Sequence, residues 1–330
     1  MKYMVFLLLF ILGLGLCCAA QQAGCTSQDV AVGVTDLKGE PFRGLGAGDF
    51  TIHGGKAPVS IRSLALDDGP RRVVLVVDQS RKLSVDGHRV AHALVKEVLA
   101  AARPQDSFAL LTARGSGRVI KFGEDVSAMA PAVAAEIEGG TGSDIGVLDA
   151  VMQAISLFGE RQPGDTILVI AASLEGNHKA NPKTVAKALN EHGIRMFGLA
   201  LGPVNRTNVA AGTQSTTAWG LATVRPGMGM NAYPQGDEDF IPLTSNSGGA
   251  VLPVINDSVH KTSSLNDPKV EQQVRQSAKV IFSMVASFYR MQLERSQGSR
   301  SDDWKLDINE SRRKAAPQTL VLYPHQLGPC

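Results

Sequence analysis

Residues 73–82 read VVLVVDQSRK, and this stretch decides the fold. The first five residues are an uninterrupted run of valine and leucine, which is typical of a strand covered on both faces. Polar residues begin at Asp78, where the strand should leave the sheet. As far as residue 201, apolar strand patterns then alternate with amphipathic helical ones. This alternation predicts an α/β fold: a doubly wound, mostly parallel sheet with helices on both faces and ligand sites at the carboxyl ends of its strands.

Hydrophobic periodicity also predicts where the elements lie. Strands are expected at residues 108–112, 119–122, 166–171, 194–201 and 248–252, and helices at 84–103, 126–138, 146–158, 182–192 and 268–286. The stretch 203–241 is rich in Gly, Thr, Asn and Pro and shows no clear period. We therefore expect a long insertion loop there, loosely packed or disordered.

Both ends of the chain have strand-like patterns. Residues 30–63 predict short strands with Gly54 and Gly55 as a hairpin turn. Strands this short bury too little to be stable alone. We expect them to pair with strands at 288–293, 304–308 and 320–322, giving a small β subdomain made from both ends. The expected division is a signal peptide at 1–20, an N-terminal β segment at 21–68, the α/β domain at 69–286 and a C-terminal β segment at 287–330.

The first twenty residues predict export. Lys2 is followed by an uncharged apolar run over residues 3–16 and then by Cys17, Cys18, Ala19 and Ala20. This is the pattern of a signal peptide cleaved after Ala20, and the run is too short to span a bilayer as a helix. We expect a secreted or periplasmic protein without a transmembrane span. A lipid anchor on Cys17, Cys18 or Cys25 is the less favoured alternative, because none follows a Leu-Ala-Gly type of box.

Cleavage after Ala20 leaves two cysteines, Cys25 and Cys330, at opposite ends of the mature chain. In an oxidising compartment they could form a disulfide, or both could stay unbridged, because the sequence does not give their separation in space. No CxxC pair or Cys/His cluster with zinc spacing occurs.

Charge and aromatic content argue against nucleic acid as a partner. The chain has 33 Lys plus Arg against 31 Asp plus Glu, a net charge of +2, and its aromatic residues make up 5%. There is no strong basic field to attract a polyanion and little aromatic surface on which bases could stack.

Several motifs resemble one family. Asp78 and Ser80 match the start of an Asp-x-Ser-x-Ser motif after an apolar strand. Thr141 in GGTGSDIG precedes Gly146 by the spacing seen around the metal-binding threonine of the same family. The flanking segments also resemble that family: its amino-terminal leader is similar to DLKGEPFRGLGAGDFTIHGGKAPVSI, and its C-terminal hairpin is similar to FYRMQLE followed by DDWKLDI. Over about residues 30–323, the chain resembles exported von Willebrand factor type A (VWA) domain proteins of the acidobacterial VWFA-related family.

This resemblance implies a metal-ion-dependent adhesion site. In the family an Asp, two Ser and a Thr hold a divalent cation, usually magnesium, and a second Asp from a TDG-type motif after the fourth strand helps through water. Hard cations of this kind take oxygen ligands. The resemblance also implies a role in adhesion or assembly rather than catalysis.

The sequence departs from that metal motif at two places. Lys82 stands where the second Ser belongs, and the TDG motif reads Ala171-Ala172-Ser173. Losing a carboxylate and gaining an ammonium changes the local charge by about two units against a cation. We therefore expect a degenerate site, with Asp78, Ser80 and Thr141 as weak metal candidates, no tight Mg²⁺ or Ca²⁺ and no cofactor. Either Lys82 pairs with Asp78 near the vacant position, or Lys82 is solvated and Asp78 caps the following loop.

Other polar residues are weaker candidates. Glu175 or His178 could replace the missing acid, although a polar loop without a ligand role explains both. His88 and His92 have i, i+4 spacing but lack the Glu of HExxH and a third ligand, so we interpret them as surface or groove residues. Asp237, Glu238 and Asp239 fit a solvated charge run better than a calcium site.

The leading functional hypothesis is an exported, non-enzymatic protein-binding module for adhesion or assembly. Its partner would be a protein or a cell-envelope component, bound without metal by loops that carry Asp78, Ser80, Lys82, Thr141 and Glu175. A structural envelope scaffold with a vestigial site is one alternative. A hydrolase that uses Ser80 or Asp78 is another, less favoured because GxSxG, GxxxxGK[ST] and GxGxxG motifs are all missing from the sequence.

Overall fold

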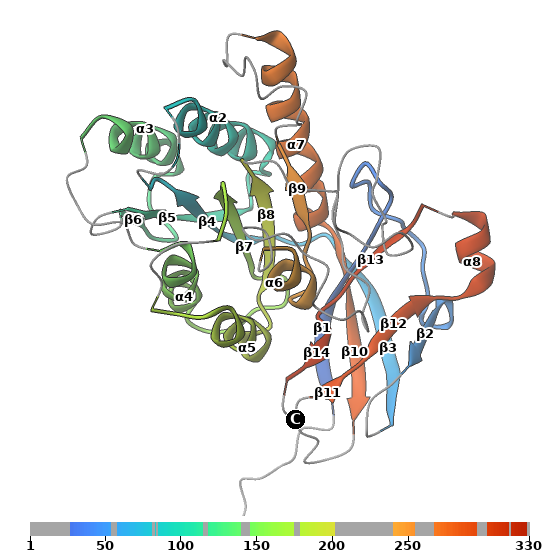
Figure 1. Ribbon diagram of the computed structural model, residues 1–330. Coiled ribbons are helices and arrows are strands. Elements are labelled where there is room, and N and C mark those ends of the chain that lie inside the picture. Colours follow the sequence, from blue (N-terminus) through green and yellow to red (C-terminus); the bar gives the residue numbers. More distant parts are fainter. Residues whose placement is uncertain are drawn as a thin grey trace, which may run out of the picture.

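A computed structural model describes most of the chain after the expected signal peptide (Figure 1). The described residues are 27–53, 58–80, 83, 85–114, 118–139, 146–174, 179–201, 240–254, 267–295, 302–316 and 318–328, without the side chains of 136–139 and 302. The signal peptide, both candidate disulfide cysteines and nearly all of the expected insertion lie outside these ranges.

The centre of the molecule is a sheet of six described strands in the order β6-β5-β4-β7-β8-β9. Its strands are β4 (Arg72–Asp78), β5 (Ser107–Ala113), β6 (Val119–Ile120), β7 (Thr166–Ala171), β8 (Arg195–Ala200) and β9 (Val251–Pro253). All neighbours are parallel except β6, which pairs antiparallel with β5. The chain enters this sheet at β4, adds β5 and β6 on one side and then adds β7, β8 and β9 on the other. The point at which the strand order reverses is therefore the carboxyl end of β4.

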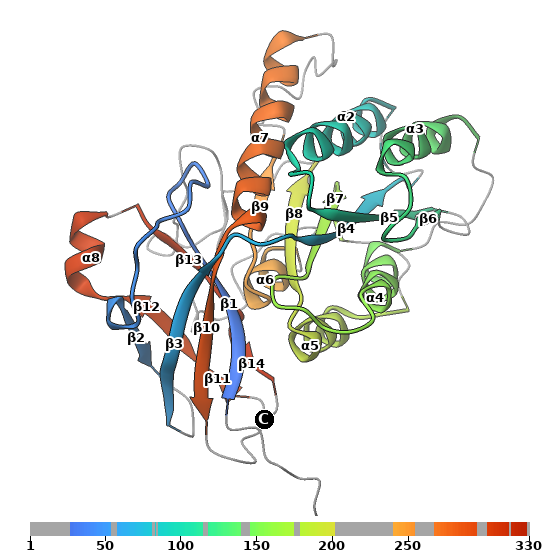
Figure 2. The same ribbon diagram turned by 180° about the vertical axis from the view of Figure 1, so that it is seen from behind.

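Helices cover both faces of this sheet (Figures 1 and 2). One face carries α2 (Val85–Ala101), α3 (Met129–Gly139, after the short η2 at Val126–Ala128) and α7 (Pro268–Ala286). The other carries α4 (Val147–Leu157), α5 (Pro182–His192) and α6 (Phe240–Asn246). Val73, Leu75 and Val77 pack on the first side and Val74 and Val76 on the second, all fully buried. The doubly wound α/β prediction is therefore confirmed, and the apolar run of β4 forms the centre of both cores.

The two ends of the chain form the smaller β unit that the sequence predicts. Its elements are β1 (Ser27–Thr35), η1 (Ala47–Asp49), β2 (Phe50–His53), β3 (Val59–Asp67), β10 (Phe288–Arg295), β11 (Asp302–Asp303), β12 (Lys305–Ile308), α8 (Glu310–Ala315), β13 (Leu320–Leu322) and β14 (Gln326–Leu327). In the main sheet the order is β13-β1-β10-β3, and β1 runs antiparallel to β10 from Ser27 opposite Glu294 to Val32 opposite Tyr289. Each end thus supplies the pairing partners of the other.

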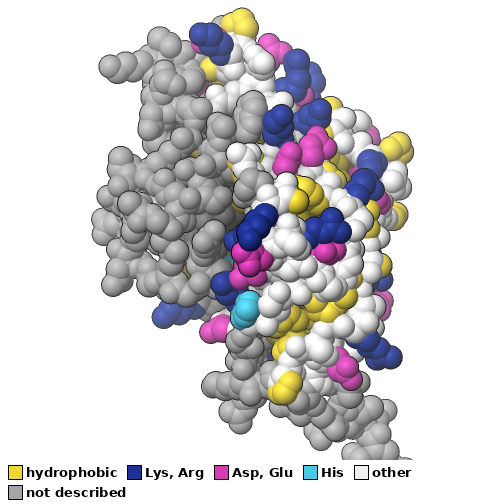
Figure 3. Space-filling view, turned by 90° about the vertical axis from the view of Figure 1, so that its right-hand side faces the viewer, with side chains coloured by type: hydrophobic (Ala, Val, Ile, Leu, Met, Phe, Trp, Pro, Cys, Tyr) yellow, Lys and Arg dark blue, Asp and Glu magenta, His cyan; other side chains and the backbone are white. Residues whose placement is uncertain are grey.

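The side of the molecule that carries α8, β12 and β2 has a mixed surface. Figure 3 shows basic and acidic side chains interspersed on its described part, with no continuous area of one sign. Close pairs such as Arg312 with Asp49 (2.8 Å) and Arg313 with Asp307 (2.9 Å) account for part of this mixture. The surface agrees with the near-neutral composition.

The predicted hairpin at Gly54 and Gly55 is wrong. The strand before it, β2, pairs with β12, and the strand after it, β3, pairs with β10. Phe50 and Ile52 lie opposite Ile308 and Leu306 in that pairing, so apolar partners from the far end of the chain outweigh the local turn chemistry.

Two further predictions need correction. The insertion does not extend to residue 241, because Phe240 and Ile241 begin α6 and are buried. The charged stretch after β12 contains the unpredicted helix α8, whose first turn is capped by the Asn309 side chain accepting the N–H of Arg312 at 3.1 Å.

The chain passes between the two units twice, from β3 to β4 and from α7 to β10, and two buried arginines hold these crossings together. Arg71 pairs with Asp67 at 2.9 Å and donates Nε–H to the Ala286 carbonyl at 3.0 Å. Arg195 donates Nη2–H to the Val285 carbonyl at 3.0 Å. Both guanidinium groups lie over the Phe288 ring, 4.3 and 4.6 Å from its centre. Cationic groups at the last carbonyls of α7 and over an aromatic face are favourable.

We predict that Phe288→Ala lowers the free energy of unfolding by about 3–5 kcal/mol, because it opens a cavity and removes the ring beneath both guanidinium groups. Phe288 is 1% exposed. Urea unfolding measures the loss. Val85→Ala is the control, since Val85 is 60% exposed, and it should change stability by no more than about 0.5 kcal/mol. Equal stability of the two variants would refute the role of this junction.

A second contact between the units involves His325. Its Nδ1 lies 2.9 Å from Asn246 Oδ1 at the end of α6, its backbone N–H donates to the Asn246 carbonyl at 2.9 Å, and its ring lies 5.1 Å from that of Tyr323. Burial lowers the pKa of His325 to about 4, although the charge of Asp303 opposes this shift. The neutral imidazole is therefore the form that joins the units.

This lowered pKa predicts acid sensitivity. The unfolded chain binds a proton at His325 near pH 6.5 and the folded chain only near pH 4, so stability is complete above this window and falls as pH drops through it. The loss is on the order of 3 kcal/mol at the lower limit. Chemical unfolding at several pH values measures it. The slope of stability against pH between 6.5 and 4 should be shallower in His325→Gln, and equal slopes would contradict the assignment.

Candidate functional site

The carboxyl ends of β4, β5 and β7 meet at one edge of the central sheet. Asp78 ends β4 in register with Ala113 at the end of β5, and Arg114 follows. Next to β4, β7 ends at Ala171 and continues into Ala172 and Ser173. We call this set of strand ends the carboxyl edge. It is where the sheet topology places a ligand crevice and where the sequence analysis placed the candidate site.

The Asp78 side chain at this edge is buried and does not project into solvent. The side chain is buried, with 5% exposed, and its Oδ1 accepts the backbone N–H of Ser80 at 2.8 Å. A short carboxylate that accepts an N–H two residues later stabilises a turn. Asp78 therefore caps the turn that leaves β4. Lys82, whose placement separates the two sequence-based alternatives, lies outside the described residues.

A buried pair of side chains lies next to Asp78. Gln79 is fully buried, and its Oε1 lies 2.9 Å from Nδ1 of His88 on the first turn of α2. Gln79 Nε2 has no hydrogen-bond partner within the described structure. His88 is 7% exposed, so its interpretation as a surface or groove residue is wrong. The polar pair fixes the start of α2 against the end of β4.

Burial lowers the pKa of His88, the negative charge of Asp78 opposes the shift, and the positive charge of Arg114 adds to it. Burial also lowers the pKa of His92, one turn further along α2, and Lys96 adds to that effect. Both imidazoles are thus favoured in the neutral form.

The residues described at the carboxyl edge do not fit a divalent cation. Among the described residues at these three strand ends, Asp78 is the one with a carboxylate, and its Oδ1 already accepts an N–H. The charge of Arg114 acts on the same surroundings, and β7 ends in Ala171-Ala172-Ser173 without an acid. A hard cation needs several anionic or neutral oxygen ligands. No group of three His, Cys, Asp or Glu side chains suited to a metal occurs anywhere in the described ranges.

Several candidates from the sequence lie outside the described residues: Lys82, Thr141, Glu175, His178, Asp237, Glu238, Asp239, Cys25 and Cys330. Of the predicted site, the structure places Asp78 and Ser80 together. Sequence reasoning missed Gln79, His88 as a buried neighbour, and Arg114. A signal for Arg114 was available, because it is the first charged residue after the apolar strand next to β4.

The topology defines the class of protein. A sheet that starts at its middle strand, has one short antiparallel strand at an edge, carries helices on both faces and places Asp-x-Ser after its first strand is a VWA-like arrangement. The chain therefore contains a VWA-like domain, as the sequence resemblance implies. No described helix is both long and apolar enough to cross a membrane.

No protein-family model matches the chain, and no curated protein matches it. Among solved structures, it resembles an aerotolerance-related membrane protein from Bacteroides fragilis, with 15% identity over 62% of this chain and 98% of that one and a TM-score of 0.38. It also resembles the SpRpn10 VWA domain, with 10% identity over 63% and 95% of the two chains and a TM-score of 0.38.

A third similar structure is proximal thread matrix protein 1 from the mussel byssus, with 11% identity over 71% of this chain and 50% of that chain and a TM-score of 0.44. Another structure of that protein has a zinc-occupied MIDAS motif. At these identities the resemblance concerns the fold alone.

We predict that Mg²⁺ leaves the melting temperature of the wild-type protein unchanged within about 1 °C at 1 mM, because a ligand that does not bind the native state cannot stabilise it. The double variant Lys82→Ser with Ala172→Asp restores the family motif and removes the unfavourable charge. Its melting temperature should rise by about 3 °C or more at the same Mg²⁺ concentration. Thermal unfolding measures both, with EDTA as the control. A rise of several degrees in the wild type at sub-millimolar Mg²⁺ would contradict this prediction.

Proposed function

We propose that this chain is an exported, non-enzymatic protein-binding module of the VWA type, which acts in adhesion or assembly. It recognises a protein or another cell-envelope component through the loops above the carboxyl edge, without a bound metal. The secreted or periplasmic location rests on the signal-like residues 1–20.

The charge at the carboxyl edge supports this proposal most directly. In a metal-dependent adhesion site the cation supplies the positive charge that attracts an acidic partner. Here Asp78 Oδ1 accepts the N–H of Ser80, the described residues at the end of β7 include no acid, and Arg114 directly follows β5 at the same edge. The described part of the edge thus has a basic residue and fewer acidic ligands than a site that retains Mg²⁺.

The same geometry argues against the hydrolase alternative. A serine nucleophile needs a base within hydrogen-bond reach, with a third group to orient that base. His88 is the described imidazole closest in sequence to Ser80, and its Nδ1 is bound to the Gln79 amide rather than to a carboxylate. Asp78 contacts the backbone N–H of Ser80. These contacts stabilise a turn and a helix start, and among the described residues they give Ser80 no base.

A binding experiment tests the proposal. Mature protein, immobilised and exposed to envelope extract, should capture the same partner in EDTA and in Mg²⁺. Asp78→Ala combined with Thr141→Ala should reduce capture of that partner by about tenfold or more, because losing the Asp78 cap changes the loop that leaves β4. Lys187→Ala combined with Lys314→Ala, at exposed positions on α5 and α8, is the matched control.

Each component of the proposal can fail separately in this experiment. Capture that requires Mg²⁺ would overturn metal independence. Equal capture by all variants would move the contact away from the carboxyl edge and favour a structural scaffold. Turnover of ester, peptide or phosphate substrates that Ser80→Ala abolishes would overturn the non-enzymatic assignment.

A further inference from the structure

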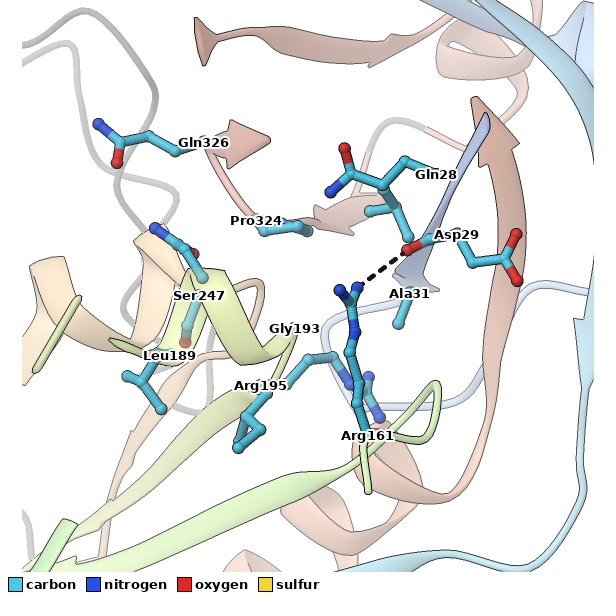
Figure 4. A pocket seen from close by; sticks show the side chains of 13 residues that line it. Gln28, Asp29, Ala31, Arg161, Leu189, Gly193, Arg195, Ser247, Pro324 and Gln326 are labelled. Carbon is cyan, nitrogen blue, oxygen red and sulfur yellow. Dashed lines mark hydrogen bonds between the residues drawn. The ribbon is translucent and has the colours of Figure 1, made fainter. Parts of the chain in front are cut away.

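The first and last strands of the described chain lie side by side in the β unit. Ser27 begins β1 opposite Glu294, near the end of β10, and β14 is the last strand among the described residues. Both ribbon views show β14 next to β1 (Figures 1 and 2). Gln28 of β1 and Gln326 of β14 line the same small cavity (Figure 4). The fold therefore brings the two ends of the described chain to one place.

Arg295, the last residue of β10, holds these two ends together. Its Nη1 donates to Gln28 Oε1 at 2.7 Å and to the Gly328 carbonyl at 2.6 Å. Hydrogen bonds from a charged guanidinium are among the stronger ones in proteins, and this side chain is buried. A Cβ built at Gly328 would lie 3.6 Å from Gln28 Nε2, which is ordinary van der Waals contact. Gln28 and Gly328 are thus fixed next to each other.

Other contacts fix the segment that leads to Gly328. Leu327 is 1% exposed and belongs to the apolar core of the β unit. The indole N–H of Trp304 donates to the Pro324 carbonyl at 2.6 Å, and β14 pairs with β11. At the other end of the chain, β1 is held by its pairing with β10. Both anchors therefore belong to the packed structure of the β unit.

A cysteine stands a few residues beyond each anchor, outside the described residues. Cys25 is three residues before Gln28, and Cys330 is two residues after Gly328. An extended chain spans at most about 3.5 Å per residue, so the two cysteine α-carbons lie within about 10 Å and about 7 Å of their anchors. A disulfide requires α-carbons about 4.4–6.8 Å apart. Because the anchors themselves are joined through the Gln28 side chain, this separation is within reach of both cysteines.

We propose that Cys25 and Cys330 form an intramolecular disulfide, which links the two ends of the chain and stabilises the β unit. The bond forms by exchange with a small external disulfide such as oxidised glutathione. The two cysteine sulfurs give up two electrons and become joined, while the S–S bond of glutathione breaks and its two sulfurs take up the electrons and the two protons. In the cell this step rests on the export in the proposed function, because compartments outside the cytosol are oxidising.

Oxidation of purified protein comprising residues 21–330 in a glutathione buffer tests the proposal, and its result does not depend on export. The oxidised monomer should have no free thiol. Trypsin should release residues 21–38 joined to residues 315–330, a pair that dithiothreitol separates and that mass spectrometry identifies. Disulfide-linked dimers, or two free thiols in the oxidised monomer, would overturn the proposal.

The melting temperature gives a second readout. Oxidised wild-type protein should melt about 5 °C or more above the same protein in dithiothreitol, because the cross-link restricts the unfolded chain. Cys25→Ser combined with Cys330→Ser is the control, and it should melt like the reduced wild type with and without dithiothreitol. Equal melting temperatures of oxidised and reduced wild type would refute the stabilising role of the bond.

The contact of Arg295 with Gln28 is tested through the equilibrium with glutathione, which gives the effective concentration of one thiol at the other. Gln28→Ala removes one acceptor of Arg295 at a partly exposed position, so it should fold and lower this effective concentration by about threefold or more. Gln153→Ala, at an exposed position on α4, is the matched control and should leave it unchanged. Equal values for the two variants would overturn the role of Arg295 in bringing the cysteines together.

Discussion

The arrangement of the molecule depends on the contact of Arg71 and Arg195 with Phe288. Their guanidinium groups lie over one ring and bind the carbonyls of Ala286 and Val285 where α7 becomes β10. Within the described residues, the chain passes between its two units near this point and at Asp67–Arg71. Burying two cations is unfavourable by itself, so their carbonyl, aromatic and carboxylate partners are what make the junction stable.

The two ends of the parallel strands have different chemistry. At the carboxyl edge Asp78 is bound into a turn, Gln79 and His88 form a buried polar pair, and Arg114 adds positive charge. At the opposite end Arg195 is buried with two N–H groups that have no described acceptor.

The sequence was most informative where one short pattern determines a structure by itself. The apolar run before Asp78 predicted a strand covered on both faces, and the helices at 182–192 and 268–286 agree with their predicted bounds. It was least informative where distant segments compete with local ones, and the pairing of β2 with β12 instead of β3 is the clearest case. Likewise, motif spacing indicated Asp78 and Ser80, but only the fold shows that His88 and the charge of Arg114 belong to the same edge.

The central claim is that the carboxyl edge carries no divalent cation, and paramagnetic broadening by Mn²⁺ tests it most directly. Mn²⁺ takes the same oxygen ligands as Mg²⁺ and broadens the NMR signals of amides close to it. A metal-free edge predicts that the amide signals of Ser80 and Ala172 keep their intensity at sub-millimolar Mn²⁺, as do those of α5 and α8. Selective loss of the Ser80 and Ala172 signals under these conditions would contradict the claim.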